Sequence, residues 1–314
     1  MIDGLLRYQA SRKNVKLIGF INGLKGLMNE DVVEINEESF KPFRNLGGYD
    51  YLGRSHDFLR TIVEQKQAGA VCQKLGLNGL VLIGATHTMS DGCALSEYFL
   101  ANNIDTSVVV VPATVNGNIR HSFISTSIGF DTASKVYSQL IGNMLSDSAS
   151  AIKYWYFIRL MGRDPSHLVL ECAMQTHPNM VIISEECAHR GETLIDIVNR
   201  ICDIVQDRAV EGKNYGCVLI PEGLLNYVAA YKNLIQEINQ LFANCHNRKE
   251  AKILSQKLYD NEKGVMDSLT PWSFSLYSTL PEFLKKQLLF EREIEGTTKI
   301  SQLETEKLIA YYVE

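Results

Sequence analysis

The stretch GLVLIGATHTMSDGCALSEYFLANNIDTSVVVVP, residues Gly79–Pro112, decides the fold class of this 314-residue chain. It begins with a short apolar run that ends at Ala85, and a second run starts at Ser107. Both runs are rich in the β-branched residues that favour buried strands. Ser90–Asn103 lies between them and has a helical pattern. Continuous apolar strands separated by helices are typical of parallel sheets covered on both faces, so the stretch predicts an α/β fold.

The same alternation continues along the rest of the chain. Further strands are expected at Val15–Ile21, His167–Ala173, Met180–Ser184 and Gly216–Pro221, and further helices at Asp131–Ile152 and Thr193–Lys213. The pattern predicts a doubly wound arrangement, in which ligands bind at the carboxyl ends of the strands. The loops at those ends are therefore the places to look for function: Gly84–Asp91, Pro112–Asn118 and Pro221–Leu224.

The pattern changes after Leu224. Residues 225–314 contain no clear apolar run of the strand type and several helical patterns, such as Ala229–Asp260. Near the end, Ser301 and Glu304 have the spacing of a capping box, which predicts a helix start there. We expect two α/β regions, 1–146 and 147–224, followed by a helical addition over 225–314.

Composition narrows the class of protein. The chain is 46% hydrophobic and 21% charged, as in soluble globular proteins. Its net charge of −5 and the lack of a Lys/Arg-rich block argue against nucleic acid or an anionic membrane as partner. No apolar run approaches the ~20 residues of a membrane span, and the N-terminus lacks a signal-peptide pattern. Seven cysteines without a C-x-x-C pair favour a reducing cytoplasm.

Several segments together resemble the phosphofructokinase family, most closely its long pyrophosphate-dependent group. They include "GATHTMSDGCALSEYF" from Gly84, "PATVNGN" from Pro112, "GFDTASKVYSQLIGN" from Gly129, "YWYFIRLMGRDPSHLVLECAMQTHPN" from Tyr154 and "LIPEGL" from Leu219. The resemblance covers essentially the whole chain in the family's order. It implies a fold of doubly wound parallel sheets with a helical C-terminal insertion, and phosphorylation of fructose 6-phosphate from pyrophosphate with Mg²⁺.

The resemblance also exposes departures in the loops that perform catalysis. Active members carry G-G-D-D where this chain has Gly84-Ala85-Thr86-His87, so a magnesium-binding carboxylate is replaced by Thr86. Mg²⁺ prefers carboxylate and water oxygens, which predicts that the metal position is lost. Active members also read P-K-T-x-D-x-D, and here the lysine is Ala113 and the proton-accepting aspartate is Asn116. An amide cannot accept a proton at neutral pH.

On the donor side the resemblance assigns positions to Arg54, Gly84 and Ala113. His87 and His121 are the alternative candidates for a base, although an ordinary loop histidine is the better interpretation of each. On the sugar-phosphate side the family pattern is preserved. Met161-Gly162-Arg163 matches M-G-R, and Pro221-Glu222-Gly223 matches P-E-G, whose glutamate accepts hydrogen bonds from sugar hydroxyls.

Thr114, Thr126 and Asp131 also stand where the family pattern expects them. An arginine suits a phosphate because its planar fork binds oxygen atoms in pairs. The resemblance therefore implies substrate-binding roles for Thr114, Met161, Gly162, Arg163 and Glu222, with fructose 6-phosphate as ligand.

From the resemblance, we expect the family's first strand and its Gly-rich donor loop to be missing and the chain to stop where the family continues. Three interpretations follow. The chain is a regulatory-type, non-catalytic subunit that assembles as a homo- or hetero-oligomer with a catalytic chain, or it is a truncated fragment, or it is an active phosphotransferase completed by missing segments or a partner. The substitutions favour the first and the ends favour the second, and the two are compatible.

Overall fold

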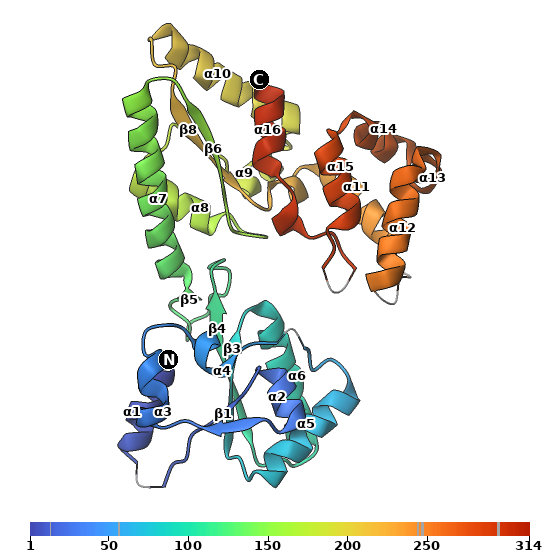
Figure 1. The fold of residues 1–314 in the computed structure, drawn as a ribbon. Helices are drawn as coiled ribbons and strands as arrows, with labels where there is room; N and C mark the ends of the chain where they lie inside the picture. The colour runs from blue at the N-terminus through green and yellow to red at the C-terminus, as the bar shows by residue number, and fades with distance from the viewer. Residues whose placement is uncertain (13, 56, 244, 246–247, 294–295) are drawn as a thin grey trace. The chain divides into compact units, whose positions relative to one another are not determined.

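The chain folds into two compact units, Met1–Ala113 and Thr114–Glu314. The computed structural model describes residues 1–12, 14–55, 57–243, 245, 248–293 and 296–314. Among these residues, none of the helices combines the length and the apolar character that a membrane crossing requires. Figure 1 draws the chain as a ribbon and labels most of its helices and strands.

Within its described residues, the first unit contains six α-helices, three complete strands and all but the last residue of a fourth strand. In chain order they are α1 (Ile2–Ala10), β1 (Ile18–Phe20), α2 (Leu24–Asn29), β2 (Val32–Glu34), α3 (Glu37–Phe40), a 3-10 turn (Lys41–Phe43), α4 (Gly48–Leu52), α5 (Ile62–Lys74), β3 (Gly79–Gly84), α6 (Thr86–Ala101) and β4 (Ser107–Thr114), which ends on the first residue of the second unit.

The parallel pair β3 and β4 forms the sheet that positions the first group of candidate residues. Its register runs from Gly79 opposite Ser107 to Gly84 opposite Pro112, as the apolar runs predict. Leu80 and Leu82 are buried in one core with residues of α5 and α6. The alternate residues of β3 are not covered, since Val81 is 41% exposed. The described chain therefore covers one face of this pair.

The strand expected over Val15–Ile21 is shorter than predicted. Only Ile18–Phe20 is extended and paired, and its partner β2 runs antiparallel to it, with Gly19 opposite Val33. Gly19 allows this close packing, because a Cβ there would lie 2.6 Å from Leu52 and 2.9 Å from Ile35. The expectation of a parallel strand at this point was wrong.

The second unit contains a sheet of three strands and the helical addition over residues 225–314, which is called the helical segment below. Its elements are β5 (Ile128–Gly129), α7 (Phe130–Ala151), β6 (Trp155–Leu160), α8 (His167–Thr176), β7 (Met180–Val181), α9 (Ser184–Arg190), α10 (Leu194–Val210), β8 (Gly216–Pro221), a 3-10 turn (Leu224–Asn226), α11 (Ala229–Phe242), α12 (Arg248–Asp260), α13 (Glu262–Ser268), α14 (Pro271–Thr279), α15 (Glu282–Phe290), a 3-10 turn (Ile300–Gln302) and α16 (Thr305–Val313).

The central strand β8 organises this unit, because it pairs in parallel with β6 on one side and β7 on the other. Every residue of β8 is buried. Cys217 and Leu219 point into one core with α7 and α8, whereas Val218 and Ile220 belong to the other, with α10 and α16. Helices thus cover both faces of β8, as its uninterrupted apolar run predicts. Figure 1 shows α7 and α16 on either side of this sheet.

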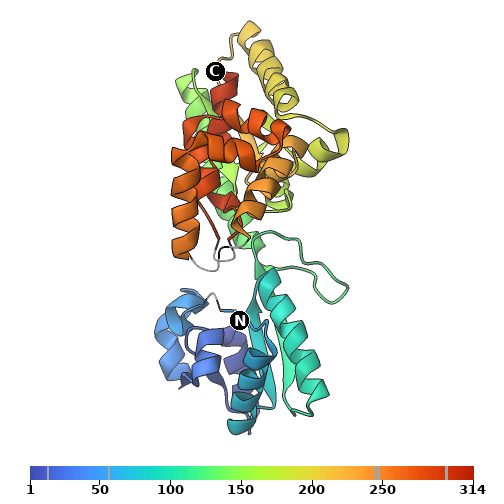
Figure 2. The same cartoon turned by 90° about the vertical axis from the view of Figure 1, so that its right-hand side faces the viewer.

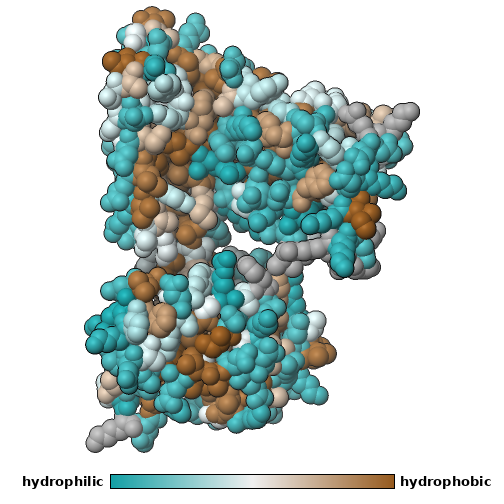
Figure 3. All heavy atoms as spheres, in the orientation of Figure 1, coloured by the Kyte–Doolittle hydropathy of each residue, from teal (hydrophilic) through white to brown (hydrophobic). Residues whose placement is uncertain are grey.

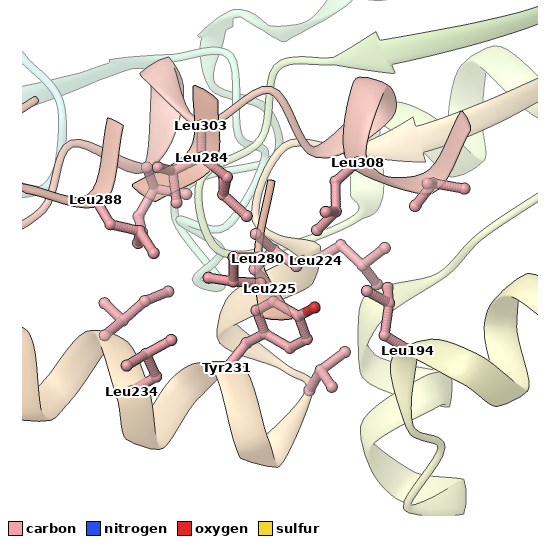
Figure 4. Packing of buried hydrophobic residues seen from close by; sticks show 14 of the residues in the cluster. Leu194, Leu224, Leu225, Tyr231, Leu234, Leu280, Leu284, Leu288, Leu303 and Leu308 are labelled. Atoms are coloured by element: carbon pink, nitrogen blue, oxygen red, sulfur yellow. The ribbon is translucent and has the colours of Figure 1, made fainter. Parts of the chain in front are cut away.

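The second core continues into the helical segment. Leucines from β8's following turn, α11, α15 and α16 meet there with Tyr231, as Figure 4 shows. Leu284 and Leu303 are completely buried. On the face drawn in Figure 3, the helices α11–α15 present mostly hydrophilic residues, so their apolar stripes face inward. The helical character expected for residues 225–314 is confirmed, and Ala229–Asp260 contains two helices.

Two sequence-based predictions in this unit were wrong. His167–Ala173 is helical, and its buried residues Leu168, Val169, Cys172 and Ala173 recur with helical spacing toward α7. A short apolar run cannot distinguish a strand from a buried helix. The capping box at Ser301 is absent as well, because α16 begins at Thr305 after a 3-10 turn.

The expected division at residues 146 and 224 stays a prediction. Helix α7 extends across the first of these positions and packs against β6, β8 and α8 of the second unit. The strand β6 was not among the strands expected from the apolar runs, because Trp155, Tyr156 and Arg159 interrupt its aliphatic residues.

Candidate functional site

Two neighbouring strand ends in the second unit bring together four of the sugar-phosphate candidates, Met161, Gly162, Arg163 and Glu222. Leu160 and Pro221, the last residues of β6 and β8, lie opposite each other in the parallel register. The Glu222 amide donates to the Leu160 carbonyl at 3.0 Å, and the Gly223 amide donates to the Gly162 carbonyl at 3.2 Å. The M-G-R and P-E-G loops are therefore joined by backbone hydrogen bonds.

Glycine is required where these loops cross. Gly162 has φ +145°, a conformation that other residues rarely adopt. A Cβ on Gly223 would lie 2.2 Å from the Arg163 carbonyl oxygen. The two glycines of the family pattern thus have a steric reason in this fold.

Glu222 is buried between the two loops and is 7% exposed. Burial raises the pKa of its carboxyl, while a hydrogen bond from the Gly162 amide and the charges of Arg159 and Arg163 act in the opposite direction. A buried, hydrogen-bonded carboxylate with free lone pairs can accept further hydrogen bonds from a ligand hydroxyl.

The M-G-R loop is held in place by residues that the sequence analysis did not single out. The Ser166 amide donates to Glu185 Oε1 at 2.9 Å, and the Ser184 amide donates to the Ser166 hydroxyl at 3.0 Å. The Tyr227 hydroxyl donates to the Asp164 carbonyl at 2.5 Å. Burial acts to raise the pKa of Glu185, but hydrogen bonds from Ser166 dominate and lower it. These contacts rigidify the loop that carries Arg163.

Arg163 itself is more open to solvent than Glu222. Its side chain is 45% exposed, and its Nη1 lies 3.9 Å from Glu293 Oε1. Met161 beside it is 50% exposed. Arg159, two residues before the loop, is 23% exposed, and its Nε lies 3.1 Å from Glu306 of α16. Both glutamates come from the helical segment.

Thr114 is the last residue of β4, and Asn116 lies in the loop that follows it. Thr114 is buried, and its hydroxyl accepts the Asn116 amide at 3.2 Å, which fixes a tight turn. Gly117 follows with φ +64°, and a Cβ there would lie 2.9 Å from the Phe130 ring. Figure 2 shows the rest of this segment, before β5, as a long open loop.

The other candidates of this region lie at the surface. Thr126 and His121 are exposed, and His121 Nδ1 lies 3.2 Å from the Ser122 hydroxyl. Asp131 is exposed and paired with Lys135 at 2.7 Å. Within the described residues, no hydrogen bond or ion pair joins Thr114 or Asn116 to Arg163 or Glu222. The roles of all these residues stay predictions.

The donor-side candidates lie in the first unit at the end of β3 and nearby. Gly84 ends β3, where a Cβ would lie 2.1 Å from the Thr88 hydroxyl, and Thr86 begins α6 and is exposed. Arg54 is exposed, with its guanidinium 5.3 Å from the centre of the Tyr49 ring, and Ala113 is half-buried.

The residues near Thr86 do not fit Mg²⁺. Thr86 provides a neutral hydroxyl, and exposed His87 contacts the Phe58 ring edge to face at 5.6 Å. The carboxylate on the same helix, Asp91, is buried and accepts the Leu59 amide, and burial raises its pKa. The described residues contain no group of three His, Cys, Asp or Glu side chains that could hold a metal ion.

Comparison with known proteins gives a consistent set of similarities. Residues 1–257 match the family description "Phosphofructokinase". The chain is 45% identical to pyrophosphate–fructose 6-phosphate 1-phosphotransferase subunit alpha 1 of Arabidopsis thaliana, across 95% of this chain and 46% of that protein. It is 39% identical to subunit beta 1 of the same plant, across 100% of this chain and 54% of that protein. The chain therefore spans about half the length of the curated relatives it matches.

A solved structure supports the fold independently. The pyrophosphate-dependent phosphofructokinase of Marinobacter aquaeolei superposes with a TM-score of 0.57 at 16% identity, across 74% of this chain and 59% of that one. At this identity the similarity concerns the fold alone, and it agrees with the parallel sheets and flanking helices described above.

Proposed function

The chain belongs to the phosphofructokinase family, and from this premise we propose that it is a non-catalytic, regulatory-type chain of a pyrophosphate-dependent phosphofructokinase. The observation that carries the proposal is Asn116 at the family's base position, on a turn closed by the Thr114 hydroxyl. The amide keeps the outline of a carboxylate and lacks its basicity.

The loss of the base has a large expected effect. General acid–base catalysis contributes about 10²–10⁴ in rate, and phosphoryl transfer depends almost wholly on positioning and electrostatics. Ala113 stands where the family has the lysine that faces the transferred phosphoryl group, and Thr86 stands where it has a carboxylate that binds Mg²⁺. These three losses concern the same reaction step, so they support a chain that does not turn over by itself.

The sugar-phosphate side supports a retained ligand. Glu222 is buried and its carboxylate accepts the Gly162 amide, and Arg163 carries a partly exposed charge. In the proposal this site binds fructose 6-phosphate, and binding there modulates a catalytic chain.

The partner in the proposal is such a catalytic chain. This part of the proposal is supported by the names of the relatives, which are alpha and beta subunits and so belong to assemblies of more than one type of chain. The proposed location is the cytoplasm, because all seven cysteines are unpaired and a reducing compartment keeps thiols in that state.

The test measures turnover of the purified chain with fructose 6-phosphate, pyrophosphate and Mg²⁺. We expect no turnover, and Asn116→Asp alone should not restore it, because catalytic groups that act as a unit are non-additive. A rate of about 1 s⁻¹ from a preparation free of contaminating enzyme would overturn the proposal.

A second arm separates the regulatory role from the alternative of an active chain completed by its partner. The chain is mixed with a catalytic chain, and in parallel with a variant of that chain whose own base is removed. The proposal expects altered kinetics in the first mixture and no turnover in the second. Turnover in the second mixture would assign catalysis to this chain.

A further inference from the structure

Two glutamates of the helical segment lie close to Arg159 and Arg163, the two arginines near Glu222. Glu306 of α16 lies 3.1 Å from Arg159, and Glu293 lies 3.9 Å from Arg163. The Glu222 carboxyl is close enough to both arginines for their charges to lower its pKa, and Asp164 is close enough to raise it. Four carboxyl groups therefore lie near these two guanidinium groups, so carboxyl groups outnumber guanidinium groups among these six side chains.

The two ion pairs differ in character. Arg159 is mostly buried and also donates to the Leu303 carbonyl, so its guanidinium is committed to α16. Arg163 is about half exposed, and within the described part of the chain its guanidinium takes part in no hydrogen bond. The exposed side of the Arg163 guanidinium is open to a competing anion.

Glu293 is presented by a well-anchored segment. Its amide donates to the Thr297 carbonyl at 2.8 Å. The neighbouring Arg292 lies 3.7 Å over the Phe242 ring and donates to Asn239 Oδ1 at 2.8 Å. Burial lowers the pKa of Arg292 to about 10. Because its partners within the described residues are neutral, Arg292 acts as an anchor and leaves Glu293 to face Arg163.

We propose that Glu293 is an intramolecular competitor for the phosphate group of the ligand at Arg163, and so sets the affinity of the sugar-phosphate site. The inference rests on the proposed function for the identity of that ligand. A phosphate that binds Arg163 must displace the Glu293 carboxylate from it.

The size of the effect follows from the distance. A unit charge about 4 Å away contributes roughly a fivefold change in affinity under water-like screening, and a surface pair contributes somewhat less. Removal of this competing charge by Glu293→Gln is therefore expected to tighten phosphate binding about three- to tenfold.

The experiment is a calorimetric titration of the whole chain with fructose 6-phosphate, with inorganic phosphate and with uncharged fructose. Glu293→Gln should tighten the first two about three- to tenfold and leave fructose unaffected. Glu291→Gln is the matched control, because Glu291 is an exposed carboxylate of the same segment. Arg163→Ala should weaken phosphate binding, and adding Glu293→Gln to it should give no further tightening.

The outcomes separate this inference from the proposed function. Unchanged or weaker binding in Glu293→Gln, or tightening that persists without Arg163, overturns the role of Glu293 while leaving a sugar-phosphate site intact. If no variant binds fructose 6-phosphate although tryptophan fluorescence shows a folded chain, both the ligand in the proposed function and the role of Glu293 fail. The turnover assay is independent of either result.

Discussion

Replacement of Gly223 by alanine is expected to separate the two loops of the sugar-phosphate site. A Cβ at this position would lie 2.2 Å from the Arg163 carbonyl oxygen, 2.9 Å from its carbonyl carbon and 3.2 Å from the Gly162 oxygen. These are backbone atoms, which cannot rotate away as a side chain can. Gly223 has φ −81°, so alanine suits the backbone conformation and the conflict is purely steric.

The cost can be estimated from the contacts that must change. Overpacking a well-packed site typically costs about 1–3 kcal/mol. Separation of the loops also strains the hydrogen bonds from the Gly223 amide to Gly162 and from the Gly162 amide to Glu222, each worth about 1 kcal/mol. We therefore expect Gly223→Ala to lower the free energy of unfolding by about 2–4 kcal/mol and to weaken sugar-phosphate binding.

Gly142→Ala is the matched control for this prediction. Gly142 lies inside α7, with no heavy atom within 4 Å of a Cβ placed there. The same substitution should raise the free energy of unfolding by about 0.5–1 kcal/mol, because glycine weakens a helix interior.

Urea unfolding followed by tryptophan fluorescence measures both variants in one assay. Trp155 and Trp272 are the two tryptophans of the chain, and both lie in the second unit with the two glycines. If Gly223→Ala costs less than about 0.5 kcal/mol, the level of an ordinary surface substitution, the reasoning from the loop crossing is refuted.

Three further predictions concern the second unit and the thiols. Burial raises the pKa of Glu222 above its usual 4.5. The protonated carboxyl therefore favours the folded state below pH 4.5. This contribution to the free energy of unfolding is lost as the pH rises through the pKa of the folded state. Glu222→Gln should therefore unfold at higher urea than the parent chain at neutral pH and at equal urea below pH 4.5, and a gap that is constant across a pH series would contradict this. Thr193→Ala should cost about 1 kcal/mol in the same assay through loss of the α10 cap, whereas Thr193→Ser should retain most of it. A thiol reagent should label exposed Cys93 first and Cys217, whose pKa burial raises to about 12, only on unfolding; fast labelling that survives Cys93→Ser would refute the assignment.

Much of the fold could be predicted because its signals are local. The apolar runs Gly79–Ala85 and Gly216–Pro221 are strands, and the pattern from Thr193 is a capped helix. Periodicity and capping depend on residues a few positions apart, so a single sequence carries them. His167–Ala173 was misassigned because a short apolar run satisfies both a strand and a helix, and its packing against α7 selects the helix.

The candidate site also has features that the sequence alone predicts and features that it does not predict. The sequence by itself specifies which side chains these loops carry, namely Asn116, Ala113 and Glu222. Their interpretation as a replaced acid, a replaced cation and a sugar-binding carboxylate comes from the resemblance to the phosphofructokinase family and stays a prediction. The apolar runs also pointed to the end of β8, Pro221–Leu224, as a place to look for function. The end of β6 was not predicted in this way, because β6 was not among the expected strands.

Only the tertiary structure decided which charges face those loops. Glu185 supports Ser166 from 19 positions away, and Arg159 donates to the Leu303 carbonyl across 144 positions. Glu293 reaches Arg163 over a similar separation. No local pattern encodes such contacts, because they arise where helices packed around one buried core bring distant surfaces together. The balance of charge around Arg163 is therefore a property of the packed fold, while the identity of each charged residue belongs to the sequence.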